Sequence, residues 1–130
     1  MKNTSKVYRN MSTVIPKDII KRKNIKNQTF VKWIINNKTN EIFLETLLKE
    51  NISPDCIDNI IKTDNHIIVY RNIYQKNHLI LPVEVEQALN FDLKIHLLKW
   101  SITNDKIKID KIRKITLQNI SGTLKEKNKM

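Results

Sequence analysis

Residues 7–25 read VYRNMSTVIPKDIIKRKNI, a stretch that contains the start and stop signals of a small strand–turn–strand–helix unit. Its first residues are rich in β-formers, and a second short apolar run ends at Pro16. Proline biases the preceding residue towards an extended conformation and also suits the first turn of a helix. We therefore expect a strand over 6–10, a turn over 11–13 and a second strand over 14–15.

A short helix is expected next, over Lys17–Lys23. Ile19 and Ile20 would face the core. Three cations fill the last turn, where they complement the negative C-terminal pole of the helix dipole. These cations are Lys21, Arg22 and Lys23. Asn24 follows, and asparagine tolerates the left-handed conformation that ends many helices.

The same signals recur further along the chain, and such repeats fix an architecture. The repeated features are VYRN at 7–10 and 69–72, an apolar run closed by proline at Pro16 and Pro82, and Lys-Trp at 32–33 and 99–100. We interpret the chain as one strand–strand–helix–hairpin unit used twice, in a mainly β fold with short helices (α+β). A unit of about 45 residues is too small to be stable alone, so the copies are expected to bury their apolar faces against each other.

The expected division of the chain is a first unit at 1–46, a connecting helical linker at 47–65, a second unit at 66–110, and a basic, partly disordered extension at 111–130. In the linker, a serine cap followed by Pro54 predicts a helix over 54–62, with Cys56 facing the core. In the second unit we expect strands over 66–71, 78–81, 93–102 and 106–109, and a helix from Pro82 to Leu89 that Asn90 ends.

Positive charge is concentrated towards the two ends of this chain of net charge +11. Residues 1–50 hold eleven basic and four acidic side chains (+7), residues 51–105 hold five and seven (−2), and residues 106–130 hold eight and two (+6). Such an excess favours polyanionic partners. The alternative is that the lysines serve only to keep the surface soluble.

Several classes of protein are disfavoured by the composition. One cysteine permits no intrachain disulfide, and no apolar run is long enough to span a bilayer, so we expect a cytoplasmic protein without a membrane partner. The histidines at 66, 78 and 96 lack metal-ligand spacing, and there is no phosphate-binding loop. We therefore expect no enzyme, no metal and no cofactor. With a single glycine, Gly122, asparagine is expected at most positive-φ turns.

Each unit resembles the SpoVT/AbrB swapped-hairpin DNA-binding domain of bacterial and archaeal transition-state regulators and MazE-type antitoxins. The resemblance lies in the apolar strand ending in proline, the helix that follows and the turn after it. The matching stretches are 14–19 and 24–28 in the first unit and 80–85 and 90–92 in the second. In that family two subunits interlock their hairpins in one barrel. The resemblance therefore implies a single-chain pseudo-dimer barrel and a double-stranded DNA-binding transcriptional regulator associated with the nucleoid, which could also form a homo-oligomer.

This sequence departs from the family pattern at its glycines. The family's Gly-Arg before the second strand is Met11-Ser12 in one copy and Asn77-His78 in the other. After the helix, asparagine replaces glycine at Asn24 and Asn90. Because asparagine tolerates the left-handed conformation, the fold survives these changes better than the pattern of DNA contacts does.

The resemblance also implies which side chains meet DNA. By position, Arg9 and Arg71 match the first-strand arginines, and Ser12 and His78 occupy the turn-arginine site, with Lys76 close enough to substitute in the second copy. On the first helix the candidates are Lys17, Lys21, Arg22 and Lys23. A solvated surface role is equally compatible with each single lysine. Trp33 and Trp100, inside apolar strands, are expected in the core rather than stacked on bases.

The second helix carries Glu84, Glu86 and Gln87 on its outer face, so we expect the first unit to dock on DNA and the second to complete the barrel or bind another partner. Cations at 111–114 could add non-specific affinity. Two alternatives stay open. One is an antitoxin-like module whose tail from Asp110 folds on a protein partner, and the other is a non-specific chromatin-type DNA binder.

Overall fold

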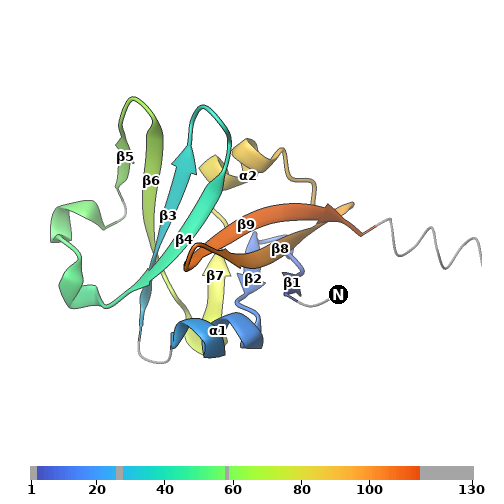
Figure 1. The fold of residues 1–130 in the computed structure, drawn as a ribbon, viewed down its shortest axis with the longest axis horizontal. Helices are drawn as coiled ribbons and strands as arrows, with labels where there is room; N and C mark the ends of the chain where they lie inside the picture. Colours follow the sequence, from blue (N-terminus) through green and yellow to red (C-terminus); the bar gives the residue numbers. More distant parts are fainter. Residues whose placement is uncertain (1–2, 26–27, 58, 115–130) are drawn as a thin grey trace, which may run out of the picture.

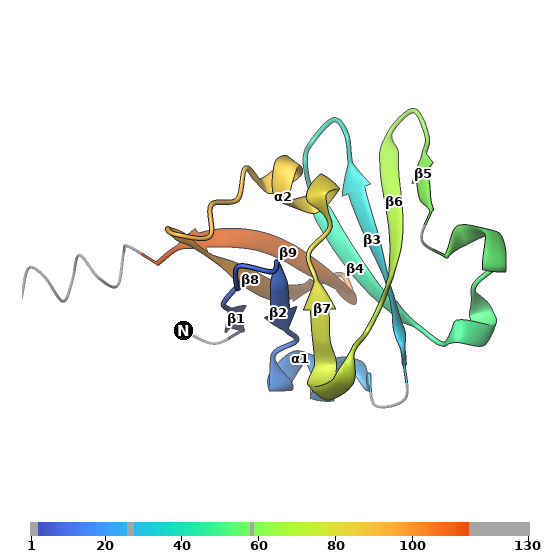
Figure 2. The ribbon, with the colours of Figure 1, turned by 180° about the vertical axis from the view of Figure 1, so that it is seen from behind.

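A seven-stranded antiparallel sheet carries a two-stranded ladder on one face and a short helix near each end of that ladder (Figures 1 and 2). The computed structural model describes residues 3–25, 28–57 and 59–114. Its strands are β1 (Thr4–Ser5), β2 (Ser12–Val14), β3 (Phe30–Asn36), β4 (Ile42–Leu47), β5 (Ile60–Lys62), β6 (His66–Asn72), β7 (His78–Ile80), β8 (His96–Thr103) and β9 (Lys106–Arg113). Its helices are α1 (Lys17–Lys23) and α2 (Val83–Leu89), with 3₁₀ turns η1 (Lys49–Asn51), η2 (Pro54–Cys56) and η3 (Gln75–Asn77).

The sheet is open. Its strand order is β1-β8-β9-β4-β3-β6-β5, and β2 pairs with β7 in a separate ladder. No hydrogen-bonded pairing within the described ranges joins the edge strands β1 and β5, so the expected closed barrel is wrong. Closure fails because β1 is only two residues long, while β5, from the linker, adds to the opposite edge of the sheet.

The two halves, residues 3–47 and 66–113, exchange their first strands. β1 pairs with β8 of the second half, and β6 pairs with β3 of the first half. The second strands, β2 and β7, pair with each other, as do the last strands, β4 and β9. At the β4–β9 junction Phe43 lies opposite Lys108, and the flanking pairs are Ile42 with Ile109 and Leu44 with Ile107. Phe43 and Lys108 occupy equivalent positions in the two halves, so the halves meet symmetrically about this pair.

Adding 66 to a residue number in the first half gives the equivalent residue of the second half, as far as the ends of the helices. Hydrogen bonds between equivalent residues occur in both halves. The matched bonds are Tyr8 N–H to Ser12 O (2.9 Å) with Tyr74 N–H to His78 O (2.8 Å), and Ile15 N–H to Asn77 O (3.0 Å) with Leu81 N–H to Met11 O (2.8 Å). Both helices end at an asparagine with left-handed backbone, Asn24 at φ 52° and Asn90 at φ 50°. Six of the nine non-glycine residues with positive φ in the described ranges are asparagines, which confirms that expectation.

The verbatim VYRN repeat is not the structural repeat. Lys32 and Lys99 are equivalent residues of the two halves. Lys32 pairs with Tyr70 of β6, but Lys99 pairs with Thr4 of β1, so Tyr70 is equivalent to Thr4 and not to Tyr8. Four extra residues separate the second VYRN from β7, so its tyrosine falls in the strand while Tyr8 falls in the turn before β2. The expected strand over 6–10 is therefore wrong, because the first strand ends at Ser5.

One hydrophobic core joins both halves. It includes Trp33 and Trp100, which are 0% and 1% exposed, so their predicted core role is confirmed. Helix α1 contributes Ile19 and helix α2 contributes Val85. Burying each large apolar side chain stabilises the fold by about 1.5–3 kcal/mol, and this core is shared between the two halves.

The linker and the C-terminal segment differ from expectation. The predicted helix over 54–62 is one 3₁₀ turn, η2, followed by the edge strand β5. Cys56 is half-buried in η2 and is not part of the core cluster. Strand β9 runs on to Arg113, beyond the expected end at 109. The disorder expected for the tail concerns residues 115–130, which lie outside the described residues.

Candidate nucleic-acid interface

Helix α1 presents a cationic face because its apolar side turns inwards. Ile19 is fully buried, whereas Lys17, Lys21 and Arg22 are exposed. The helix carries four cations and one carboxylate, a net charge of +3. The equivalent helix α2 carries two carboxylates and no cation, a net charge of −2. The same backbone feature is therefore basic at one end of the molecule and acidic at the other.

A turn from the second half lies beside this helix. The β2–β7 ladder sets His78 opposite Val14, and Ile15, just before the proline that opens α1, donates its N–H to Asn77 O at 3.0 Å. Turn η3 consequently lies next to α1, as Figure 2 shows. Its Lys76 is exposed, with a left-handed backbone at φ 59°. Each half thus contributes at least one cation to one surface, which we call the α1 surface and define as Lys17, Lys21, Arg22, Lys23 and Lys76 together with His78.

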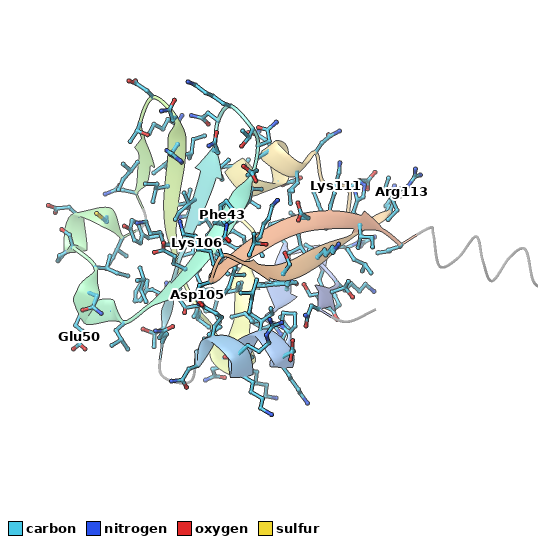
Figure 3. All side chains as sticks on the ribbon, viewed as in Figure 1. Phe43, Glu50, Asp105, Lys106, Lys111 and Arg113 are labelled. Carbon is cyan, nitrogen blue, oxygen red and sulfur yellow. The ribbon has the colours of Figure 1, made fainter. Side chains whose placement is uncertain are left out.

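Two members of the α1 surface have carboxylate partners. Arg22 Nη1 lies 3.4 Å from Asp18 Oδ2, an exposed pair worth about 0.3–0.5 kcal/mol. Lys23 Nζ donates to Asp105 O at 2.6 Å and lies 3.3 Å from Asp105 Oδ1. Figure 3 shows Asp105 on the β8–β9 turn, near α1. Within the described residues Lys17, Lys21 and Lys76 make no such pair, so these three have the least competition for phosphate.

The other predicted contact residues lie elsewhere. Arg71 is in β6, where its Nη1 donates to Tyr70 O at 2.9 Å. Arg9, in the turn before β2, shares a cavity with Glu86 of α2. Ser12 lies opposite Ile80 at the far end of the ladder from His78. The expected match between Arg9 and Arg71 is wrong in space, because the shift of 66 residues relates Arg9 to Gln75.

Sequence reasoning missed a second group of cations. Lys6, Lys94 and Lys114 join Arg9 and Tyr8 around the cavity between the first-half turn and the α2–β8 loop. They come from three separate segments, and their proximity depends on the pairing of β1 with β8. Beside them His96 is 7% exposed, and burial, with Lys111 and Arg113 nearby, lowers its pKa. The local sequence contains no signal for this grouping.

Two further features are absent from the part of the chain that the structure describes. It contains no cluster of three potential metal-ligating side chains. None of its helices is long and apolar enough to cross a bilayer. Comparison with known proteins finds no matching family model, no matching curated protein and no matching solved structure.

Proposed function

We propose that this chain is a double-stranded DNA-binding regulator built from two AbrB-like units in a swapped-hairpin arrangement, and that it docks on DNA through the α1 surface. The observation that carries the proposal is the joining of a +3 helix from one half with a cationic turn from the other. Cations spread over two chain segments can meet phosphates on both strands of a duplex, which positions a protein in register on the DNA.

The swapped-hairpin interpretation is supported by the exchange of first strands between the halves. It is also supported by the backbone at the position where the resembled family has glycine. Met11 and Asn77 occupy that position, and both have left-handed φ angles, 65° and 60°. Asparagine tolerates this conformation, but for methionine it costs energy, so at Met11 the surrounding turn must impose it. At this position both copies thus have the backbone conformation that glycine favours, which supports the resemblance.

The binding is asymmetric in this proposal. At the positions of Lys21, Arg22 and Lys23, helix α2 has Gln87, Ala88 and Leu89. The net charge of −2 on α2 repels phosphate, so the duplex lies against the α1 end. One molecule then contacts a single short site. A homo-oligomer would bring a second α1 surface to the same duplex, and regulation of transcription at the nucleoid is the role that such binding would serve.

Selection of duplexes from a random pool, read at two salt concentrations, tests this function. We expect the full chain to enrich particular duplexes at low salt and to retain a preference at physiological salt. Salt weakens the phosphate contacts, which release counter-ions, more than it weakens contacts to base edges. Retention without enrichment would support a non-specific chromatin-type binder instead. Loss of all DNA at physiological salt, together with recovery of a stoichiometric protein, would favour the antitoxin-like module and contradict the proposal.

A further inference from the structure

A cavity of about 810 Å³ lies between the turn of the first half and the α2–β8 loop of the second. Its walls are residues 6–9 and 90–96, with Glu86 of α2 and Lys114 just after β9. This volume lies within the range of small-molecule sites, which commonly form between two packed units. The cavity is separate from the α1 surface, with which it shares no residue.

An aromatic platform lines this cavity. Tyr8 is 49% exposed, although hydrogen bonds fix the backbone on both sides of it. Lys6 Nζ lies 5.3 Å from the centre of the Tyr8 ring. Phe91 and His96 are both nearly buried, with ring centroids 5.5 Å apart. An accessible aromatic ring on a fixed backbone, beside cations, is a typical stacking surface for a nucleobase.

Positive charge outweighs negative charge around the cavity. Four cations, Lys6, Arg9, Lys94 and Lys114, face two carboxylates, Glu86 and Asp92. Within the described ranges none of these cations pairs with a carboxylate, so their charge is available to an anion.

The loop that forms one wall is held in place by hydrogen bonds. Lys114 Nζ donates to Leu93 O at 2.8 Å, and Lys111 Nζ donates to Asn90 O at 3.2 Å. Figure 3 shows Lys111 and Arg113 near the end of β9, the part of the strand next to this loop. Asp92 N–H also donates to His96 Nδ1 at 2.9 Å. A wall fixed in this way loses little entropy when a ligand binds.

The other half provides an internal comparison. The shift of 66 residues relates Tyr8 to Tyr74, but it relates Lys6 to Asn72 and Arg9 to Gln75. The same turn therefore forms without either cation. The turn backbone thus does not depend on a lysine and an arginine at these two positions, which leaves Lys6 and Arg9 available to a ligand.

We propose that this cavity binds a nucleoside phosphate, with the base stacked on Tyr8 and the phosphates held by Lys6, Arg9 and Lys94. The carboxylates of Glu86 and Asp92 can accept hydrogen bonds from exocyclic amino groups of the base. Such a ligand bridges the first-half turn and the second-half loop, and so holds the two halves together at this end of the molecule. This site does not depend on the proposed DNA-binding function.

Titration calorimetry of the full chain with ATP, GTP, CTP and UTP tests the site. We expect at least one nucleotide to bind with one-to-one stoichiometry, and inorganic triphosphate and the free nucleoside each to bind at least tenfold more weakly. Triphosphate binding as tightly as the nucleotide would overturn the proposal, because it would reveal a simple anion patch. Absence of binding by all four nucleotides would also overturn it.

Matched variants locate the binding. Tyr8→Ala should weaken nucleotide affinity about tenfold, by the worth of one stacked base, while Tyr74→Ala in the equivalent turn should leave it unchanged. Lys6→Asn with Arg9→Gln, which copies the other half, should weaken affinity further, whereas Lys38→Gln on the β3–β4 turn should not. Equal effects of the two tyrosine variants, in chains with unchanged thermal unfolding, would contradict the assignment.

Discussion

Trp100 Nε1 donates a hydrogen bond to Ser5 Oγ at 2.8 Å, whereas the same atom of its counterpart, Trp33, is buried without a partner among the described residues. The difference lies in the strand that packs beside each ring. Arg71 takes the place of Ser5 next to Trp33, and a guanidinium can only donate. A buried, unpaired N–H costs about 1–3 kcal/mol. The two halves share equivalent backbone hydrogen bonds but differ in this side-chain hydrogen bond.

Arg71→Ser should therefore stabilise the protein by about 1 kcal/mol, because the serine hydroxyl would accept the Trp33 Nε1 proton. Thermal unfolding would show this as a rise in Tm of a few degrees. As the opposite control, Ser5→Ala removes the acceptor of Trp100 and should lower the free energy of unfolding by about 1–3 kcal/mol. A lower Tm for Arg71→Ser would contradict this prediction. It would mean that packing of the arginine side chain stabilises the fold by more than the unpaired Trp33 N–H destabilises it.

Lys17→Gln with Lys21→Gln should weaken duplex DNA binding and flatten its salt dependence. Loss of two phosphate contacts reduces the slope of log K against log salt by about 1.8. Fluorescence anisotropy at four or more salt concentrations measures that slope. Lys38→Gln with Lys62→Gln makes the same charge change on exposed turns and edges away from α1. If this control pair flattens the slope equally, binding follows net charge and not the α1 surface.

Acidification should weaken the fold through His96. Burial, aided by Lys111 and Arg113, lowers the pKa of His96 below its usual value of 6.5, while Asp92 opposes this effect. The unfolded chain therefore binds a proton more readily, and the contribution of His96, complete above pH 6.5, declines as the pH falls towards the folded-state pKa. Urea unfolding at pH 7.5 and 5.5 measures the loss.

His96→Gln isolates this effect, since glutamine does not titrate but can still accept the Asp92 N–H. We expect the wild-type chain to lose more stability than the variant between the two pH values. Parallel losses in the two proteins would show that other groups, such as the carboxylates, account for all of the pH dependence.

The exchange of first strands predicts that the halves cannot fold separately. Fragments 1–53 and 54–130 should each lack dispersed NMR spectra, because β1 and β6 would lose β8 and β3 as partners. Mixing the fragments at equal concentration should restore the dispersed spectrum of the intact chain. A folded spectrum from either fragment alone would contradict this mutual dependence of the two halves.

Local signals in the sequence predicted α1 and α2 well but failed in the linker, where the helix expected over 54–62 is a single 3₁₀ turn followed by a strand. The expected helix over Lys17–Lys23 has those bounds, and the second ends at Asn90 as predicted, because proline and asparagine act on their own segments. The burial of Trp33 and Trp100 was likewise readable from apolar strands. Each of these features depends on residues close together in the chain.

Strand partners were not predictable in the same way. The identical VYRN segments suggested that Tyr8 is equivalent to Tyr70. The hydrogen bonds show instead that Tyr8 is equivalent to Tyr74, since each lies in the turn before the second strand of its half. Register depends on which strand lies alongside, so the identical segments alone did not show that the four-residue difference in the first turn moves the second tyrosine into the strand. The open sheet, the edge strand β5 and the cavity beside Tyr8 also depend on contacts between distant segments.

NMR mapping of backbone amides during titration with a selected DNA duplex tests the central claim most directly. We predict that the largest shift changes fall in α1 and in residues 75–78, which belong to different halves of the chain, and that α2 shows little change. Changes concentrated in α2, or spread evenly over the surface, would contradict docking through the α1 surface.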